Sequence, residues 1–156
     1  MPSRVKIRIQ DVPDHRRELD ELVDHCTQNT LISWAMKVAQ RVLPYATGEV
    51  GEGREVMEAF IILRQRQSGL VRAHDVRQAG FAVHALARTV QSDPARYALR
   101  CVGQAIGVGH MREHAMVCGD YAIKVLNSDP DKTIEDVKRE RELQIRELKE
   151  LAKQES

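Results

Sequence analysis

The signal that most constrains the fold of this sequence is a helix start that occurs twice, as Ser92-Asp93-Pro94 and as Ser128-Asp129-Pro130. In each copy the Asp can cap free amide groups of a first helical turn. The Pro that follows lacks an N–H group, which costs nothing there because the first turn leaves its amides unpaired. The two copies therefore predict that two long helices begin at these points.

Apolar residues at helical spacing predict further helices upstream. They cover approximately residues 13–26, 30–43, 54–67 and 71–90. Pro44 helps to end the second of them, and the Gly-rich stretch 48–53 is a predicted loop. Together with the helices that begin at the two signals, over residues 94–126 and 131–154, the pattern predicts an all-α fold, a helical bundle of about five to six helices.

The predicted helix over residues 94–126 contains four glycines, Gly103, Gly107, Gly109 and Gly119. A glycine inside a helix costs roughly 1 kcal/mol relative to alanine, so these residues require either close helix packing or a kink. We expect this long Gly-rich helix to be central, to pack closely on the helix over residues 71–90 and to bend near Gly107. The charged C-terminal helix, over residues 130–154, is expected to pack on its own domain or to extend as a partner-binding arm.

Length and composition indicate one globular domain. The chain has 156 residues, of which 42% are hydrophobic and 30% charged, and a chain of this size can bury a core without disulfides or a structural metal. We therefore expect a single helical domain over residues 1–156, with an extended N-terminal piece over residues 1–12. Cys26, Cys101 and Cys118 lie among apolar neighbours, so we interpret them as small buried hydrophobic residues.

Charge and hydropathy argue against two classes of partner. The net charge of +1 gives no field that draws a protein onto nucleic acid or an anionic membrane. No stretch approaches the roughly 20 apolar residues that span a bilayer, and the N-terminus lacks the apolar stretch of a secretory signal. Charges of both signs alternate over residues 137–142, which is typical of a solvated helix face. We expect a cytoplasmic protein that binds neither nucleic acid nor membrane.

The string His110-Met111-Arg112-Glu113-His114 is the feature that most suggests catalysis. Imidazoles four residues apart on one helix share a face and can chelate zinc, and the H-x-x-E-H order matches the inverted zincin motif. Glu113 would then be the base that activates a metal-bound water. His84, on the neighbouring predicted helix, could supply a third ligand. The alternative function is thus a metal-dependent hydrolase that uses His84, His110, Glu113 and His114.

A structural role for these histidines is the interpretation we favour. At about 100° per residue, a continuous helix would place both histidines of the motif in one arc facing the core, and a buried neutral imidazole usually bonds a carbonyl, a tyrosine or another histidine. No phosphate-binding loop or nucleophile elbow accompanies them, so we expect no enzyme, no metal and no cofactor. The predicted structural core includes Trp34, His84, Gly103, Gly107, His110, His114 and Tyr121.

Several segments of the chain resemble a bacterial family of immunity proteins. These segments are Arg41-Val42-Leu43-Pro44, His84-Ala85-Leu86-Ala87-Arg88, Arg96-Tyr97-Ala98 through Ala105, His110, Glu113-His114-Ala115, Tyr121-Ala122-Ile123-Lys124, and Glu140-Arg141-Glu142-Leu143-Gln144 with Leu148. The resemblance covers residues 31–151, and Leu143 stands where an aromatic residue is expected. It implies an all-helical, non-catalytic protein that protects a bacterium by binding and blocking a toxin encoded beside it or nearby.

A binding protein of this kind needs a rigid scaffold and one complementary surface of roughly 800 Å² per partner. If the toxin were a nuclease, an acidic surface would be expected to bind it, and the candidates are Glu49, Glu52, Glu55 and Glu58. A third hypothesis is a helical oligomerisation module in which the last helix joins copies of the chain into a homo-oligomer.

Overall fold

The computed structural model describes residues 2–155, and over that range it contains eight helices and no strand. The helices are α1 (Pro13–Asp24), α2 (Gln28–Val42), α3 (Pro44–Val50), α4 (Arg54–Gln67), α5 (Ala73–Ala87), α6 (Asp93–Gly107), α7 (His114–Ser128) and α8 (Ile134–Gln154). The all-α class is confirmed, although the helices exceed the five to six expected. Met1 and Ser156, at the ends of the predicted domain, lie outside the described residues.

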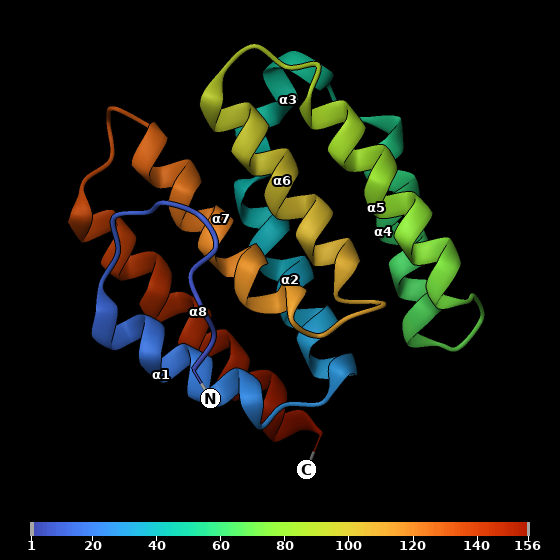
Figure 1. Ribbon diagram of the computed structural model, residues 1–156, viewed down its shortest axis with the longest axis horizontal. Coiled ribbons are helices and arrows are strands. Elements are labelled where there is room, and N and C mark those ends of the chain that lie inside the picture. Colours follow the sequence, from blue (N-terminus) through green and yellow to red (C-terminus); the bar gives the residue numbers. More distant parts are fainter. Residues whose placement is uncertain (1, 156) are drawn as a thin grey trace.

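The central helix is α6, which packs against α5 and α7 and also against α2 and α3 (Figure 1). On one side α4 covers α5, and on the other α1 and α8 lie together against α2 and α7. One hydrophobic core runs through this arrangement, and its largest fully buried apolar side chains include Trp34, Leu31, Leu99 and Ile106. None of the helices in the described range is long and apolar enough to cross a membrane.

The prediction of one long helix over residues 94–126 is wrong, because α6 and α7 form a helical hairpin. Within the turn over residues 108–113, the amides of His110 and Met111 both donate to the Gly107 carbonyl, at 3.0 Å each. Side chains of other helices bind the turn: Gln28 donates to the Val108 carbonyl at 2.8 Å, and Arg66 donates to the Gly109 carbonyl at 2.9 Å. A continuous helix there would be about 50 Å long, whereas a compact domain of this size is about 40 Å across. The bend expected near Gly107 is therefore a full reversal of the chain.

Glycines of α6 allow close contacts with both neighbouring helices. A Cβ atom added at Gly103 would lie 2.5 Å from Cε1 of His84 on α5, and one added at Gly107 would lie 2.8 Å from Cγ of His114 on α7. On α5, a Cβ added at Gly80 would lie 3.8 Å from the Gly103 carbonyl oxygen. The predicted close packing on the helix over residues 71–90 is thus confirmed at Gly103, whereas Gly107 packs against α7.

Only one of the two Ser-Asp-Pro signals starts a helix at the predicted place. Ser92 caps α6, and its Oγ accepts a hydrogen bond from the Ala95 amide at 3.3 Å. Ser128, by contrast, ends α7. The C-terminal helix begins at Ile134 rather than near residue 130, because Thr133 and Asp136 form a capping box there.

The predicted loop over residues 48–53 is partly helical. Pro44 ends α2 and also lies in the first turn of α3, which continues to Val50. The chain then turns at Gly51 and Gly53, whose φ angles are 63° and 60°. Residues other than glycine rarely adopt a positive φ of this kind, so glycine is required at this turn.

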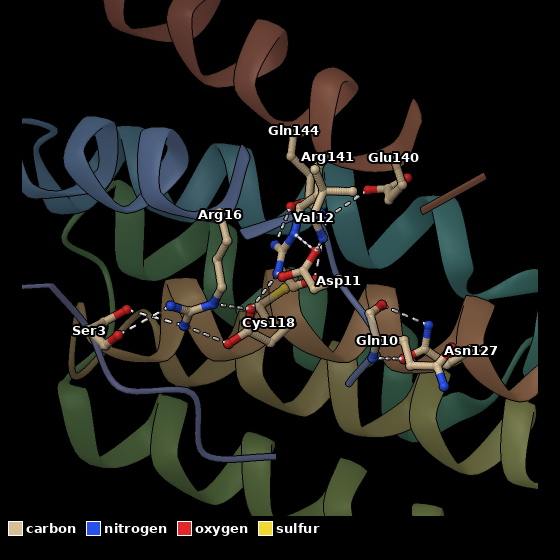
Figure 2. Close-up of polar contacts among 12 residues, drawn as sticks. Ser3, Gln10, Asp11, Val12, Arg16, Cys118, Asn127, Glu140, Arg141 and Gln144 are labelled. Carbon is tan, nitrogen blue, oxygen red and sulfur yellow. Dashed lines mark hydrogen bonds and ion pairs between the residues drawn. The ribbon is translucent and has the colours of Figure 1, made fainter. Parts of the chain in front are cut away.

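A network of charged side chains lies inside the protein between the N-terminal segment, α1, α7 and α8 (Figure 2). Arg141 on α8 is completely buried, and it donates to Asp11 through Nε at 3.0 Å and through Nη2 at 2.8 Å. Its Nη2 also donates to Asp120 Oδ1 at 2.6 Å. From α1, Arg16 donates to both carboxylate oxygens of Asp120, at 3.0 and 2.9 Å. We call these four residues the interior network.

Further hydrogen bonds extend from the interior network along α8. Gln144 Oε1 accepts from Arg141 at 2.9 Å, and Gln144 Nε2 donates to Glu140 at 2.8 Å. The two oxygens of Glu140 accept from Arg41 of α2, at 2.8 and 2.9 Å. Trp34 Nε1 donates to the Gln144 backbone carbonyl at 2.9 Å. These bonds satisfy the buried side chains of Glu140, Arg141 and Gln144. Glu147 Oε1, also buried, has no hydrogen bond and instead lies 2.9 Å from Nη1 of Arg41 in an ion pair.

The predicted solvated face over residues 137–142 is correct for the exposed Lys138, Arg139 and Glu142, but wrong for Glu140 and Arg141. Glu140 and Arg141 are 8% and 0% exposed, because their charges pair with residues far away in the sequence. The apolar stripe of α8 is also covered by its own chain, since α8 packs on α1, α2 and α7. Two hypotheses from the sequence, a partner-binding arm and an oligomerisation module, both assigned this helix to contacts with another protein chain.

The segment over residues 2–12, which precedes α1, forms neither helix nor strand. The Ser3 amide donates to Asp20 at 2.5 Å, and Gln10 exchanges backbone hydrogen bonds with the side chain of Asn127. Of the cysteines, Cys101 and Cys118 are buried with their sulfur atoms 3.6 Å apart, and Cys26 is half-buried.

Candidate functional site

The H-x-x-E-H string does not lie on one helix. His110 belongs to the turn between α6 and α7, and His114 is the first residue of α7. Glu113 precedes α7 directly, but its side chain makes no capping hydrogen bond. The two imidazole rings meet edge to face, with their centroids 5.0 Å apart. Because the turn replaces the predicted helix, the string lacks the shared helical face on which the inverted zincin interpretation depends.

His114 is held in place by α6. Its Nδ1 atom lies 2.7 Å from Oε1 of Gln104, and its ring packs on Gly107. An amide oxygen only accepts, so in this arrangement Nδ1 carries the hydrogen. Burial, followed by the nearby His110 and Lys6, lowers the pKa of His114. The ring is therefore a neutral, fixed element between the two helices of the hairpin.

His84 is fixed in a similar way on α5, but its polar partner is an arginine. Nη1 of Arg100 lies 2.9 Å from Nδ1 of His84, and a guanidinium only donates, so Nδ1 is the acceptor. Burial, and then the proximity of Arg100, His114 and Arg88, lowers the pKa of His84 to about 4. The neutral imidazole thus positions the Arg100 guanidinium on the surface of α6.

Two half-buried tyrosines continue this surface toward the other end of the hairpin. The rings of Tyr97 on α6 and Tyr121 on α7 lie 6.4 Å apart between centroids. Lys124 Nζ lies 5.3 Å from the centre of the Tyr97 ring and donates to the Arg8 carbonyl at 2.6 Å. Cations over aromatic rings are held by the ring's quadrupole, so this amine is partly ordered.

These contacts connect residues of α5, α6, α7 and the turn between α6 and α7 into one surface, which we call the basic face. We add Lys6 and Arg88 to it because their charges act on His114 and His84, respectively. The three helices lie next to one another in Figure 1. The basic face consists of Lys6, His84, Arg88, Tyr97, Arg100, Gln104, His110, His114, Tyr121 and Lys124. Within residues 2–155, none of its lysines and arginines forms an ion pair with Asp or Glu. Glu113 is exposed beside it.

The histidines of the basic face do not fit a metal centre. The Arg100 guanidinium brings a positive charge to within 2.9 Å of Nδ1 of His84, where it would repel a cation. Nδ1 of His114 is engaged by Gln104. No group of three or more His, Cys, Asp or Glu side chains in the described part of the chain could hold a metal ion.

The four glutamates proposed as an acidic surface differ in their environments. Glu49 on α3 accepts hydrogen bonds from the Ser92 hydroxyl at 2.6 Å and from the Gln91 amide at 2.6 Å, which lower its pKa. Glu58 on α4 pairs with Arg54 at 2.9 Å. Glu52 and Glu55 are exposed. Two of the four carboxylates therefore already bind groups of the same chain.

The seven residues predicted for the structural core lie at two depths. Trp34, Gly103 and Gly107 are buried, whereas the three histidines and Tyr121 are half-buried on the basic face. Sequence reasoning did not single out Arg100 and Gln104. A signal for them existed, because Tyr97, Arg100 and Gln104 are spaced by three and four residues and so share one face of a helix.

The fold over residues 2–155 places the protein among all-helical proteins. Residues 21–151 match a family model described as "Imm-5 like putative immunity protein". The match covers most of the chain, so the protein belongs to this family. The resemblance inferred from the sequence is confirmed. Neither a curated protein nor a solved structure matches the chain.

Proposed function

We propose that this protein is an immunity protein that binds a bacterial toxin in the cytoplasm and neutralises it without catalysis. The observation that carries the proposal is the family match over residues 21–151. The structure is compatible with it, because a fixed helical scaffold presents exposed and half-buried polar side chains that can contact another protein. A buried, fully paired interior network keeps that scaffold rigid.

A direct test is to produce the toxin encoded beside the gene of this chain in cells with and without the chain. Neutralisation predicts that growth is restored only when both are present, and that the purified proteins form a 1:1 complex in isothermal titration calorimetry. A chain that neither restores growth nor binds the toxin would contradict the proposal.

The ratio of this protein to toxin that protection requires distinguishes binding from catalysis. If the protein acts by binding, protection requires at least one copy for each toxin molecule, because each blocked toxin occupies one copy. An enzyme that modified or degraded the toxin would protect at far lower ratios. Titrating the chain against a fixed amount of toxin and measuring the remaining toxin activity distinguishes the two, and protection well below a 1:1 ratio would rule out simple blocking.

The exposed glutamates can be tested in the same complex. If the acidic surface binds the toxin, replacing Glu52 and Glu55 by Lys together weakens the complex, since both residues are exposed. Unchanged affinity of the E52K/E55K variant would remove that surface from the proposal while leaving neutralisation itself intact.

A further inference from the structure

We propose that the basic face binds a carboxylate-rich segment of a partner protein. The inference rests on the proposed function for the nature of the partner, which is a protein. It adds the surface and the chemistry of the segment that the surface recognises.

The first argument is the pairing of charges. Inside the protein, Arg16 and Arg141 each bind carboxylates of the same chain. On the basic face, by contrast, Lys6, Arg88 and Arg100 form no ion pair with any carboxylate in the described range, and Lys124 binds only a backbone carbonyl and a tyrosine ring. Cations that the fold leaves unpaired remain available to a complementary surface and steer its approach.

The second argument is that the central cation is held in place before any partner arrives. Arg100 is half-buried, and its Nη1 group is fixed by His84, whose ring rests on Gly103. The Nε and Nη2 groups of the guanidinium have no partner within residues 2–155. A side chain ordered in advance loses less entropy on binding, and a guanidinium can bind a carboxylate through two parallel hydrogen bonds.

The third argument is the presence of aromatic anchors among these cations. Tyr97 and Tyr121 are half-buried, so part of each ring is free to contact a partner while the rest packs in the protein. Tyrosine and arginine are enriched at the residues that contribute most to binding energy in interfaces. The basic face therefore combines ordered positive charge with apolar contact area.

A polypeptide fits this surface better than a nucleic acid does. The net charge of the whole chain is only +1, so other surfaces carry a compensating excess of carboxylates, including Glu52 and Glu55. A duplex extends its charge beyond any local patch and would meet these carboxylates. An acidic segment of a protein can place its charges within the basic face alone.

The experiment is a titration of the 15N-labelled full chain with a synthetic oligoglutamate peptide, followed by NMR. Backbone amides of α6 and α7 on the basic face should shift, and added salt should weaken the effect. The R88E/R100E variant should lose the shifts. A matched variant, K37E/R64E, makes the same change in net charge at exposed positions of α2 and α4 and should keep them.

Three outcomes of this titration would overturn the inference: no shifts, shifts centred on another surface, or equal loss of binding in both variants. Tighter binding of a DNA duplex than of the peptide at the same salt concentration would also overturn it. If R88E/R100E fails to fold, the K6E/R88E variant takes its place, because both of its positions are exposed.

A second arm uses the toxin and separates the inference from the proposed function. R88E/R100E should bind the toxin at least about tenfold more weakly than the K37E/R64E control. If both variants bind the toxin equally well, the basic face is not the site and the proposed function stands. If the toxin does not bind the unaltered chain at all, the proposed function fails, and the peptide titration alone decides whether the face binds carboxylates.

Discussion

Two groups of arginines in this protein have opposite environments. In the interior network, Arg16 and Arg141 are held by Asp120 and Asp11, and Asp120 is almost completely buried. On the basic face, Arg88 and Arg100 have no carboxylate partner in the described chain. Both groups use the same residue type in the same bundle. The comparison shows that the pairing of a charge, rather than its presence in the sequence, separates a structural residue from one free to bind a partner.

Substitutions in the interior network and on the basic face should therefore change the stability of the protein by different amounts. Removing one member of a buried, paired set leaves another charge unpaired in a medium of low polarity, which is costly. Removing a solvated cation that has no partner changes little in the folded state. The predictions below test this difference, beginning with the largest effect.

Substitution of Asp120 by Ala should destabilise the protein most. It leaves Arg141 with one carboxylate partner and Arg16 with none, and breaking a buried pair in this way costs about 3–5 kcal/mol. Urea denaturation followed by circular dichroism measures the loss in free energy of unfolding. A loss below about 1 kcal/mol would mean that the interior network contributes no more than surface ion pairs do.

Substitution of Gly107 by Ala should have the next largest effect, about 1–3 kcal/mol, because the added Cβ overlaps the ring of His114. Gly48→Ala is the matched control. It also lies in a helix, but nothing is within 4 Å of the added atom, so better helix propensity should stabilise it by up to about 1 kcal/mol. Thermal denaturation of both variants gives the comparison, and equal shifts in the same direction would contradict the close contact.

Acid should lower the stability of the folded protein through protonation of His84. Its pKa is about 4 in the folded protein against an ordinary value of 6.5, so the folded state favours the neutral ring. Its contribution to stability is complete above pH 6.5 and is lost as the pH falls from 6.5 to about 4. The expected loss is about 1 kcal/mol or less, since solvent screens a half-exposed ring.

The measurement for His84 is the free energy of unfolding of the original protein and of a His84→Gln variant between pH 4 and pH 7.5. The original protein should lose more stability than the variant on acidification. Identical pH profiles would show that His84 titrates alike in the folded and unfolded states.

Substitution of Arg88 by Gln should have the smallest effect, within about 0.5 kcal/mol, because the side chain is exposed and has no ion-pair partner in the described range. The same denaturation assay used for Asp120→Ala measures it. A loss comparable to that of Asp120→Ala would remove the distinction between the two groups of arginines.

Local signals in the sequence predicted most of the helices. The cap at Ser92 and the apolar stripe of α4, with Val56, Ala59 and Leu63, are encoded within a few residues. The break between α6 and α7 was not predicted as a reversal, because the carbonyls of its turn are bound by Gln28 and Arg66 from distant helices. A periodic pattern cannot contain that information.

The candidate site could likewise be predicted only in part, because some of its features depend on contacts between distant parts of the chain. The sequence drew attention to His84, His110 and His114, which all lie on the basic face. It did not show that Arg141 is buried and Arg88 is exposed, because the partner of Arg141, Asp11, lies 130 residues away. Such charges look alike in a list of residues and differ only once the chain has folded.

The separation between Asp11 and Arg141 also has a consequence for synthesis on the ribosome. At about 5–20 residues per second, Arg141 emerges on the order of ten seconds after its carboxylate partner. Until then the nascent chain holds Asp11 without the guanidinium that pairs with it and, for most of that time, Arg16 without Asp120. The interior network can therefore close only after the last helix has been made, late in synthesis.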